Sequence, residues 1–478
     1  MDKLYLVWSL LVVVLEARGE IFDRHSGSKI GSDLHTINRT CAIDVRPCQP
    51  HEGSRVDGTC NNYKYPSRGS ARGPYLRLLK PDYGPNGNIR KDRNGKSLPS
   101  ARKVRTELHS TGRVIDHVNF NAAAVTFLDF INRDISVVDG ILDYLRRRQY
   151  CCEERGKLDY RCAPIHIPHD DPYLRINFQT PVLDLSTIYG EDEEALKKIR
   201  KYQYGLINEE IRMNRRVPLN ETGDVCFQNT KSNGVCYKFG YKNMVASGLI
   251  SEQVDYVTAY NDDAVPLVFA EYEIARRYFR TLLDGRIKKY SERHHYVGEF
   301  SYSDTLFRQE LLEIDTNYED INRGIFYQPA AKVDDIQDPD ISEKFYGQLQ
   351  NAADLVAADI QRGRDLGVQG YNAYRELCGL KAAKHFEDLL DVMSVEKMEF
   401  LKKLYHDIED INLLAGIMSE NLMPGTFVGP TLYCIMTKQF HLMRFSDRFW
   451  FERGDQYHSF TPELVSLSKR TLSNLPKN

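Results

Sequence analysis

The stretch VNFNAAAVTFLDFINRDI, residues 118–135, predicts one buried helix around which the rest of the chain is organised. One face of this helix, at i, i+4, i+7 spacing, carries Val118, Ala122, Val125, Asp129 and Asn132. Arg133 and Asp134 follow directly. An apolar stripe that ends in polar and charged groups indicates a core or a pocket whose polar side chains have a task, because buried polar groups need partners.

The composition is that of an ordinary globular protein. Of 478 residues, 42% are hydrophobic and 27% are charged. A formal net charge of −3 gives no electrostatic reason to expect nucleic acid or an anionic membrane as partner. Because no repeat or low-complexity linker divides the chain, we expect one mainly α domain with few short strands. Helical periodicity also marks residues 137–148, 251–283 and 352–380.

Residues 1–19, MDKLYLVWSLLVVVLEARG, have a charged start, an apolar run and the small residues Ala17 and Gly19 near the end. This pattern is typical of a secretory signal peptide, and a buried N-terminal helix is the weaker alternative. No later stretch is long and apolar enough to span a membrane. We therefore expect a secreted, extracellular protein with an extended cysteine-containing arm at 20–59 and its main domain at 60–478.

Ten cysteines agree with an extracellular chain. Their even number favours disulfides, and none of their spacings is a convincing zinc site. Two sequons, at Asn38 and Asn220, predict glycosylation wherever those residues are exposed.

Residues 353–380, ADLVAADIQRGRDLGVQGYNAYRELCGL, resemble the characteristic helix of the animal haem peroxidases. Further matches follow the order of that family: DGTCNNYKYP at 57–66, LDLSTIYGEDEEALKKIR at 183–200, LLEIDTNYEDIN at 311–322 and FVGPTLYCIMTKQFHLMRFSDRFWFE at 427–452. The resemblance runs from about residue 60 to the C-terminus and is closest to secreted, peroxinectin-like arthropod members. It implies a single peroxidase-like domain.

The resemblance also implies disulfides and a calcium site. The implied pairs are Cys226–Cys236 and Cys378–Cys434, with Cys162 closing on Cys151 or Cys152. The implied calcium ligands are Asp134, Thr180, Val182, Asp184 and Ser186. Calcium takes about six to eight oxygen ligands, and these residues offer carboxylates, hydroxyls and backbone carbonyls. The alternative is a polar turn that caps the following helix.

At the haem site the resemblance implies losses. In the family the distal helix resembles Gln-x-x-Asp-His-Asp, so a register fixed on Asp134 puts Asp129 at the Gln, Asn132 at the haem-linking Asp and Arg133 at the distal His. Arginine stays protonated up to about pH 12 and cannot shuttle a proton. Asparagine cannot form the ester link to haem.

The remaining haem positions point the same way. The catalytic arginine falls at Leu249, while the second haem-linking Glu is kept as Glu252. Counting back from Asn317 puts the proximal His at Asp304 and its neighbouring arginine at Ser301. The asparagine that orients the proximal His becomes Asp359, and Arg362 keeps a propionate contact. His294, His295 and Tyr302 are weak substitutes for the iron ligand, and each is better explained as surface or core.

The complete set of implied calcium ligands predicts that calcium is kept, while these losses predict that haem is not bound and that peroxidase activity is lost. They also predict that Arg133 pairs with Asp129, with Asp304, or with both, since an unpaired buried guanidinium is costly. The expected role is extracellular binding or adhesion on a calcium-stabilised scaffold, to a protein or cell-surface partner.

Two other roles stay open. One is an active haem peroxidase that oxidises phenols or tyrosines in matrix, cuticle or eggshell, or in the response to oxidative stress. The other is a partner that forms homodimers or heterodimers with active relatives. Residues 453–455 form an Arg-Gly-Asp tripeptide, for which an integrin-binding role is the weaker interpretation.

Overall fold

The protein is described by a computed structural model. It describes residues 45–71, 73–85, 88–137, 176–177, 179–186, 209–212, 215–218, 265–305, 308, 311–312, 314–344, 354–454 and 459–462. The expected signal peptide, the start of the arm and the helix at 137–148 lie outside these ranges, apart from Val137.

Helices dominate the described part of the chain, so the mainly α fold is confirmed. The helices are α3 Ala101–Leu108, α4 Ala122–Ile135, α9 Ala270–Ala275, η3 Arg276–Leu282, α10 Tyr302–Thr305, α11 Asn317–Tyr327, α12 Pro339–Ser342, α13 Leu355–Asp365, α14 Tyr371–Leu377, η6 Phe386–Asp391, α15 Val395–Leu404, η7 Ile408–Asp410, α16 Leu413–Ser419 and α17 Pro430–Ser446.

In the described ranges the strands are short and form two-stranded ribbons. They are β1 Gly73–Pro74, β2 Ser110–Thr111, β3 Asp116–Asn121, β4 Ile176–Asn177, β5 Glu209–Arg212, β6 Arg215–Pro218, β7 Arg286–Tyr290, β8 Tyr296–Ser301, β9 Pro329–Ala331 and β10 Ile336–Gln337. Four ribbons are antiparallel, β1–β4, β3–β9, β5–β6 and β7–β8, and the β2–β10 pair is parallel.

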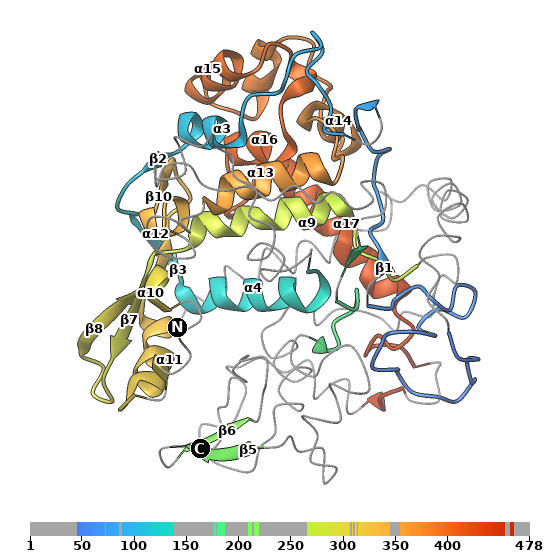
Figure 1. Cartoon of the computed structure of the whole chain (residues 1–478), viewed down its shortest axis with the longest axis vertical. Helices are drawn as coiled ribbons and strands as arrows, with labels where there is room; N and C mark the ends of the chain where they lie inside the picture. Colours follow the sequence, from blue (N-terminus) through green and yellow to red (C-terminus); the bar gives the residue numbers. More distant parts are fainter. Residues whose placement is uncertain are drawn as a thin grey trace.

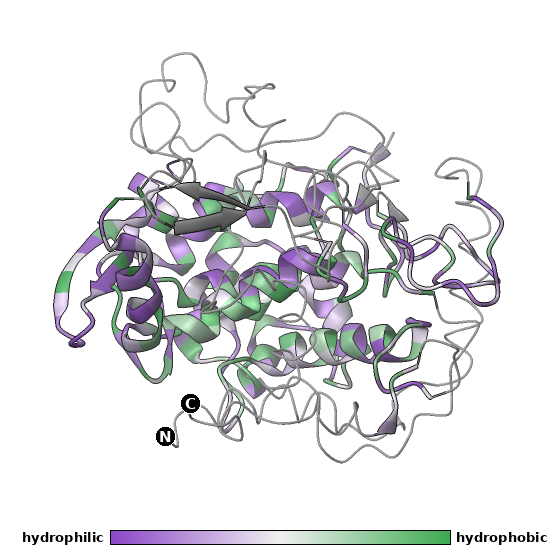
Figure 2. Ribbon diagram, turned by 90° about the horizontal axis from the view of Figure 1, so that it is seen from below, coloured by the Kyte–Doolittle hydropathy of each residue, from purple (hydrophilic) through white to green (hydrophobic). Residues whose placement is uncertain are grey.

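Helix α4 crosses the middle of the molecule (Figure 1). The helix α9 runs above it, with α13 and α16 beyond and the β7–β8 hairpin at one end. Hydrophobic residues gather on the central helices, and hydrophilic ones lie toward the edges (Figure 2). The helices therefore surround one hydrophobic core, and α4 lies along one side of it.

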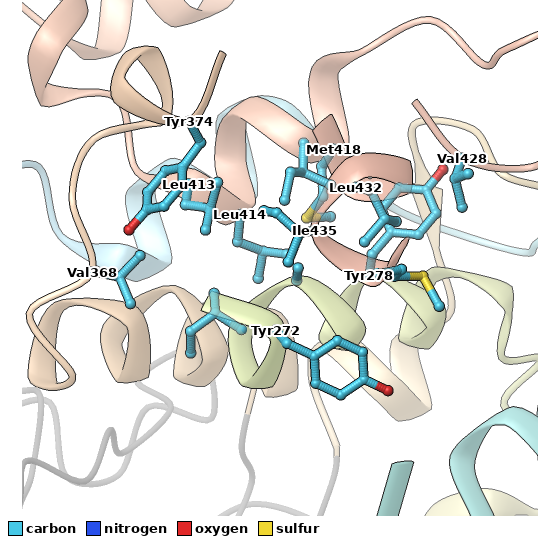
Figure 3. Close-up of a cluster of buried hydrophobic side chains, with 14 of the residues drawn as sticks. Tyr272, Tyr278, Val368, Tyr374, Leu413, Leu414, Met418, Val428, Leu432 and Ile435 are labelled. Carbon is cyan, nitrogen blue, oxygen red and sulfur yellow. The ribbon is translucent and has the colours of Figure 1, made fainter. Parts of the chain in front are cut away.

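The core is built where α9, η3, α16 and α17 meet. Leu414, Leu432 and Ile435 lie between them, and burying each such side chain contributes about 1.5–3 kcal/mol (Figure 3). Tyrosines at its margin carry a hydroxyl to a buried acceptor. Tyr278 Oη donates to the Phe427 carbonyl at 3.0 Å, and Tyr272 Oη donates to Asn132 Oδ1 at 2.6 Å. The second bond joins α9 to α4.

Helix α4 begins four residues later than its periodicity predicts. Residues 116–121 form β3, which pairs with β9, and the side chain of Asn121 caps the helix by accepting from Ala124 N at 3.2 Å. Val118, expected on the buried face, lies on the strand and is 76% exposed. The prediction was wrong there because strand pairing and an N-cap override an apolar pattern.

The helix expected over residues 251–283 is also shorter in its described part. Val265–Phe269 is extended, and Leu76 bonds the backbone on both sides of Phe269, at Val268 O and Ala270 N, each at 2.8 Å. Pro266 adds a residue that disfavours a helix interior. The helix starts at Ala270 and tightens into the 3₁₀ turn η3.

The stretch at 352–380 contains two helices rather than one. Helix α13 ends in a Schellman motif, in which Val368 N bonds Gly363 O and Gly367 N bonds Arg364 O, each at 3.0 Å. Gly367 has a φ of 62°, and a Cβ there would come within 2.5 Å of the Tyr83 ring. Glycine is therefore required at this turn.

Among the described helices, none combines the length and the apolar character that a membrane span needs.

Candidate functional site

The last turns of α4 carry the polar residues that the sequence singled out. Arg133 Nε lies 2.7 Å from Asp129 Oδ2, one turn earlier. The two side chains are 58% and 48% exposed, so this is a half-open pair rather than the buried one expected. Asn132 is buried and accepts the Tyr272 hydroxyl, and Asp134 points to the other side of the helix, toward residues 180–186.

The pairing of Arg133 with Asp129 is confirmed. Loss of water around Asp129 opposes its ionisation, but Arg133, Arg280 and Arg276 together hold the pKa of that carboxyl below its usual value. The Asp129 carboxylate in turn raises the pKa of Arg133. Arg133 therefore stays a cation, and an imidazole-like proton shuttle is absent from this helix.

Across from α4, the fully buried carboxylate Asp359 on α13 holds two arginines. Arg280 Nη1 donates to its Oδ2 at 2.6 Å, and Arg362 Nη1 donates to its Oδ1 at 2.7 Å. Arg277 Nε lies 4.0 Å from Oδ1. One carboxylate thus fixes both η3 and the side of α13 that faces it.

This geometry corrects the proposed proximal position. Asp304 is exposed on the short helix α10, where Arg308 donates to its carbonyl at 3.5 Å. The residue that faces Asp359, the position matched to the orienting asparagine, is Arg280 on η3 and not Asp304. The expected pairing of Arg133 with Asp304 is likewise not found.

A signal for Arg280 was present in the sequence. Residues 276–280, RRYFR, have an arginine three positions before the last residue and an aromatic between them, as in the family's Phe-Arg-Phe-Gly-His run. Counting back from Asn317 missed it because a hairpin, β7–β8, and the helix α10 lie between η3 and that anchor. In this register the arginine of that run is matched by Arg277 rather than by Ser301.

A second buried carboxylate, Glu273, joins η3 to the end of α4. Arg276 Nε donates to its Oε2 at 2.7 Å, and Arg277 and the Ser136 hydroxyl also contact it. Burial opposes its ionisation, but the two arginines outweigh this and lower the pKa of Glu273 to about 2. Arg276 Nη2 also donates to Ser136 O at 2.8 Å. Glu273 was not recognised from the sequence, since one acid among arginines gives no periodic signal.

The expected calcium residues do come together. Leu185 N donates to Asp134 Oδ2 at 3.0 Å, and Ser186 Oγ donates to Asp134 O at 3.2 Å. Within the loop, Thr180 Oγ1 lies 2.8 Å from both Asp184 Oδ1 and Ser186 Oγ. Leu185 adopts a φ of 66°, an uncommon conformation that turns this loop around the end of α4.

The loop from Thr180 to Ser186 offers a hard cation its preferred ligands. Burial raises the pKa of Asp184 to about 6 and the nearby negative charge of Asp447 adds to this shift, although the hydrogen bonds from Thr180 and Ser186 oppose it. Two carboxylates and two hydroxyls enclosed in this way form a set of oxygen ligands that suits calcium. The residues present therefore fit a calcium ion.

The motif at 57–66 supports this loop. Gly58 packs against Thr180, and a Cβ on it would come within 3.1 Å of Thr180 Cγ2. Asn61 reaches the end of α17, where Nδ2 donates to Asp447 Oδ1 at 2.8 Å and Oδ1 accepts from Arg448 N at 2.9 Å. The resemblance had matched both segments separately, and the structure brings them together.

Two disulfides lie in the described part of the chain. Cys378–Cys434 confirms one expected pair, and Cys48–Cys60 is a pair that the sequence did not assign. Cys48 and Cys60 lie close to Glu52, but their sulfurs are bonded to each other and are not free thiolates for a metal.

Several predicted residues lie outside the described ranges: Asn38, Cys162, Asn220, Cys226, Cys236, Leu249 and Glu252. Of the Arg-Gly-Asp tripeptide, Arg453 is buried and Asp455 also lies outside. A buried arginine is not available to a surface receptor, which supports the non-adhesive interpretation of that tripeptide.

Known proteins match the chain along most of its length. The family model for animal haem peroxidase matches residues 54–179, 174–254 and 239–476. A peroxidase of Drosophila melanogaster is 28% identical over 94% of this chain and 81% of its own length. The peroxidasin homolog of Homo sapiens is 26% identical over 87% of this chain, which spans only 35% of that protein.

Solved structures agree on the fold. Peroxidase A from Dictyostelium discoideum superimposes with a TM-score of 0.69 at 18% identity, covering 88% of this chain and 94% of its own. A fatty acid alpha-dioxygenase from Oryza sativa reaches a TM-score of 0.64 at 14% identity, over 98% of this chain and 92% of its own. These likenesses show the fold, and the family model, which matches most of the chain, shows that the chain belongs to the animal haem peroxidase family.

Proposed function

We propose that this protein is a non-catalytic member of its family, a pseudo-peroxidase that acts as an extracellular binding or partner protein. The observation that carries the proposal is the pair of guanidiniums at the positions matched to the two iron-flanking histidines. Arg133 is held by Asp129, and Arg280 is held by Asp359. A guanidinium that stays protonated offers iron no lone pair and accepts no proton from peroxide.

The residues of α4, α9 and η3 do not fit haem held through an iron–imidazole bond. None of these helices contains a histidine. The buried His109 sits at the C-terminal end of α3, where burial and the nearby Lys397 and Arg105 lower its pKa to about 3. The conversion of asparagine to Asp359 removes a neutral partner for an imidazole and supplies a countercharge for an arginine.

An active peroxidase is the alternative, favoured by the names of the relatives. The Drosophila relative is called a peroxidase, and this chain keeps Arg277 and Arg362 where the family contacts haem propionates. The pseudo-peroxidase and the active peroxidase differ in one property, the ability to ligate haem iron.

The test is haem reconstitution of the purified, calcium-loaded protein. We expect added haemin to keep the spectrum of the free compound, with no sharpened Soret band near 400 nm, and peroxide-dependent dye oxidation to stay at the level of haemin alone. An active family member treated in parallel serves as the positive control. A stoichiometric Soret band together with peroxide turnover would establish the active alternative and refute the proposal.

The calcium site is proposed to be retained. Asp134 and Asp184 would supply carboxylates, Thr180 and Ser186 hydroxyls, and Thr180 and Val182 backbone carbonyls. Calcium there supplies no redox chemistry, and these residues would use it to fasten the 180–186 loop to the end of α4. The two buried acids would otherwise repel each other and Asp447 in a poorly hydrated setting.

Adding calcium to chelated protein is expected to raise its melting temperature. A ligand at about 100 times its Kd stabilises the folded state by about 2.7 kcal/mol, and magnesium should do less because it prefers smaller octahedral sites. Differential scanning calorimetry with and without EGTA measures the effect.

Asp184→Asn should abolish most of this calcium-dependent increment. The matched control is Asp92→Asn, since Asp92 is also a loop carboxylate that accepts two backbone amides, Asn94 N and Lys96 N. The control should shift the melting temperature equally with and without calcium. Equal calcium responses in both variants would argue against these ligands.

A further inference from the structure

Five arginines and three carboxylates meet between the end of α4 and the pair η3 and α13. We call the arginines the arginine cluster: Arg133, Arg276, Arg277, Arg280 and Arg362. Among the described residues, their ion-pair partners are Asp129, Glu273 and Asp359. Within the part of the chain that the structure describes, the cluster therefore carries two more positive charges than negative ones.

Three of the five arginines lie nearer the solvent than two of the three carboxylates. Glu273 and Asp359 are fully buried, while the side chains of Arg280, Arg362 and Arg133 are 20%, 28% and 58% exposed. Asp129 is the one partner that is itself half exposed. On the side of η3 and α13, a molecule entering from solvent therefore meets the guanidiniums of Arg280 and Arg362 before it meets the buried carboxylate of Asp359.

The guanidiniums also have donors to spare. Arg133 uses Nε on Asp129, and Arg362 uses Nη1 on Asp359, which leaves their other N–H groups without a hydrogen-bond partner among the described residues. A guanidinium presents its donors as a planar fork that matches the two oxygens of a carboxylate or phosphate. Each of these two guanidiniums is therefore held by one hydrogen bond and has other N–H groups available to a ligand.

The members of the cluster share one electrostatic neighbourhood. Arg280 and Arg362 occupy the two oxygens of Asp359, so their head groups lie side by side. Arg280 and Arg276 also lower the pKa of Asp129, the partner of Arg133 on α4. The arginines of η3 therefore lie close enough to the end of α4 to act electrostatically on Asp129.

We propose that the arginine cluster binds a small dianionic oxyanion, a phosphate or a dicarboxylate, in the region where catalytic relatives hold haem. The inference rests on the proposed loss of haem and names what this site takes instead. A charge of two on the ligand matches the excess of two on the described cluster. The attraction between opposite charges is stronger in a partly desolvated site than in bulk water.

Binding of two probes, inorganic phosphate and succinate, to the full-length protein tests the proposal. Isothermal calorimetry and thermal unfolding are run in the presence of either dianion or of chloride at the same ionic strength. We expect one dianion to bind and to raise the melting temperature, whereas chloride does not. Phosphate and succinate are compared to tell which oxyanion chemistry the site prefers.

Variants locate the site. Arg133→Gln and Arg362→Gln should each weaken dianion binding about tenfold or more, the loss expected for a charge-assisted hydrogen bond. Arg323→Gln on α11 is the matched control: Arg323 is also 28% exposed and also pairs at 2.7 Å with an acid three residues away, Asp320. The control should keep full affinity.

The outcomes separate this inference from the proposed function. Absence of dianion binding, or equal losses of dianion affinity in Arg323→Gln and Arg362→Gln, overturns the anion site. Neither result affects the proposal that the protein does not bind haem. A Soret band that phosphate or succinate does not reduce overturns both. Dianion binding that depends on Arg133 and Arg362 supports the site, whatever partner the protein has.

Discussion

Replacing Asp359 by alanine should lower the free energy of unfolding by about 3–5 kcal/mol, the cost of leaving buried charges without their partner. Asp359 is fully buried and binds Arg280 and Arg362 directly, with Arg277 close by. Its removal leaves three cations facing one another across η3 and α13. Chemical denaturation monitored by circular dichroism measures the loss.

Two further variants separate charge from packing. Glu387→Ala breaks the Lys402–Glu387 pair, which has the same 2.6 Å separation as Arg280–Asp359 but is exposed on both sides, so it should change stability little. Adding Arg280→Met to Asp359→Ala should recover part of the loss, because it removes one stranded cation. If the double variant were less stable than Asp359→Ala alone, the unpaired charge of Arg280 would not be the cause of the lost stability.

Stability should also fall as the pH rises through neutrality, because of Glu420. This buried side chain accepts the Tyr371 hydroxyl at 2.6 Å and Thr431 N at 3.0 Å, at the start of α17. Gly429 makes this approach possible, since a Cβ there would come within 2.3 Å of Glu420 Oε2. Burial raises the pKa of Glu420 to about 7 from its ordinary 4.5.

The sign follows from which state binds the proton more tightly. A raised pKa means that the folded protein favours protonated Glu420, so the contribution to stability is complete below pH 4.5 and is lost as the pH rises through 7. The difference amounts to about 3 kcal/mol. Glu420→Gln cannot ionise and should lack this dependence.

Urea unfolding of both proteins between pH 5 and 8 checks the expectation. Other titrating groups affect wild type and Glu420→Gln alike, so the stability difference between them isolates Glu420. The free energy of unfolding of Glu420→Gln should increase relative to that of the wild type as the pH rises. A difference that does not vary with pH would mean that Glu420 ionises normally.

Sequence predicted the fold well where pattern and chemistry agree. The signature at 353–380 singled out Asp359 and Arg362, which are in contact in the structure, and Cys378–Cys434 forms as expected. The boundaries were less accurate, because an N-cap at Asn121, a bridge at Phe269 and a Schellman turn at Gly367 each depend on a partner distant in the chain.

The candidate site was predicted on one side and missed on the other. Asp134 contacts residues 180–186 as expected, and Arg133 forms the expected ion pair with Asp129. The role of Arg280 was not predicted, because the β7–β8 hairpin and α10 lie between it and Asn317, from which the positions were counted. The contact with Asp359 is what identifies its position. The role of a residue in this site depends on which side chain it contacts on the opposite element. Spacing along the sequence does not identify that contact.

The hydrogen bonds of Asn61 have a consequence for how the molecule is made. Asn61 is 386 residues from Asp447 along the chain, yet both of its amide atoms bond to the end of α17. The segment around Asn61 emerges early from the ribosome and waits for nearly the whole of synthesis before these partners exist. Contacts of such long sequence separation slow folding, so we expect the contact between the segment around Asn61 and the end of α17 to form late.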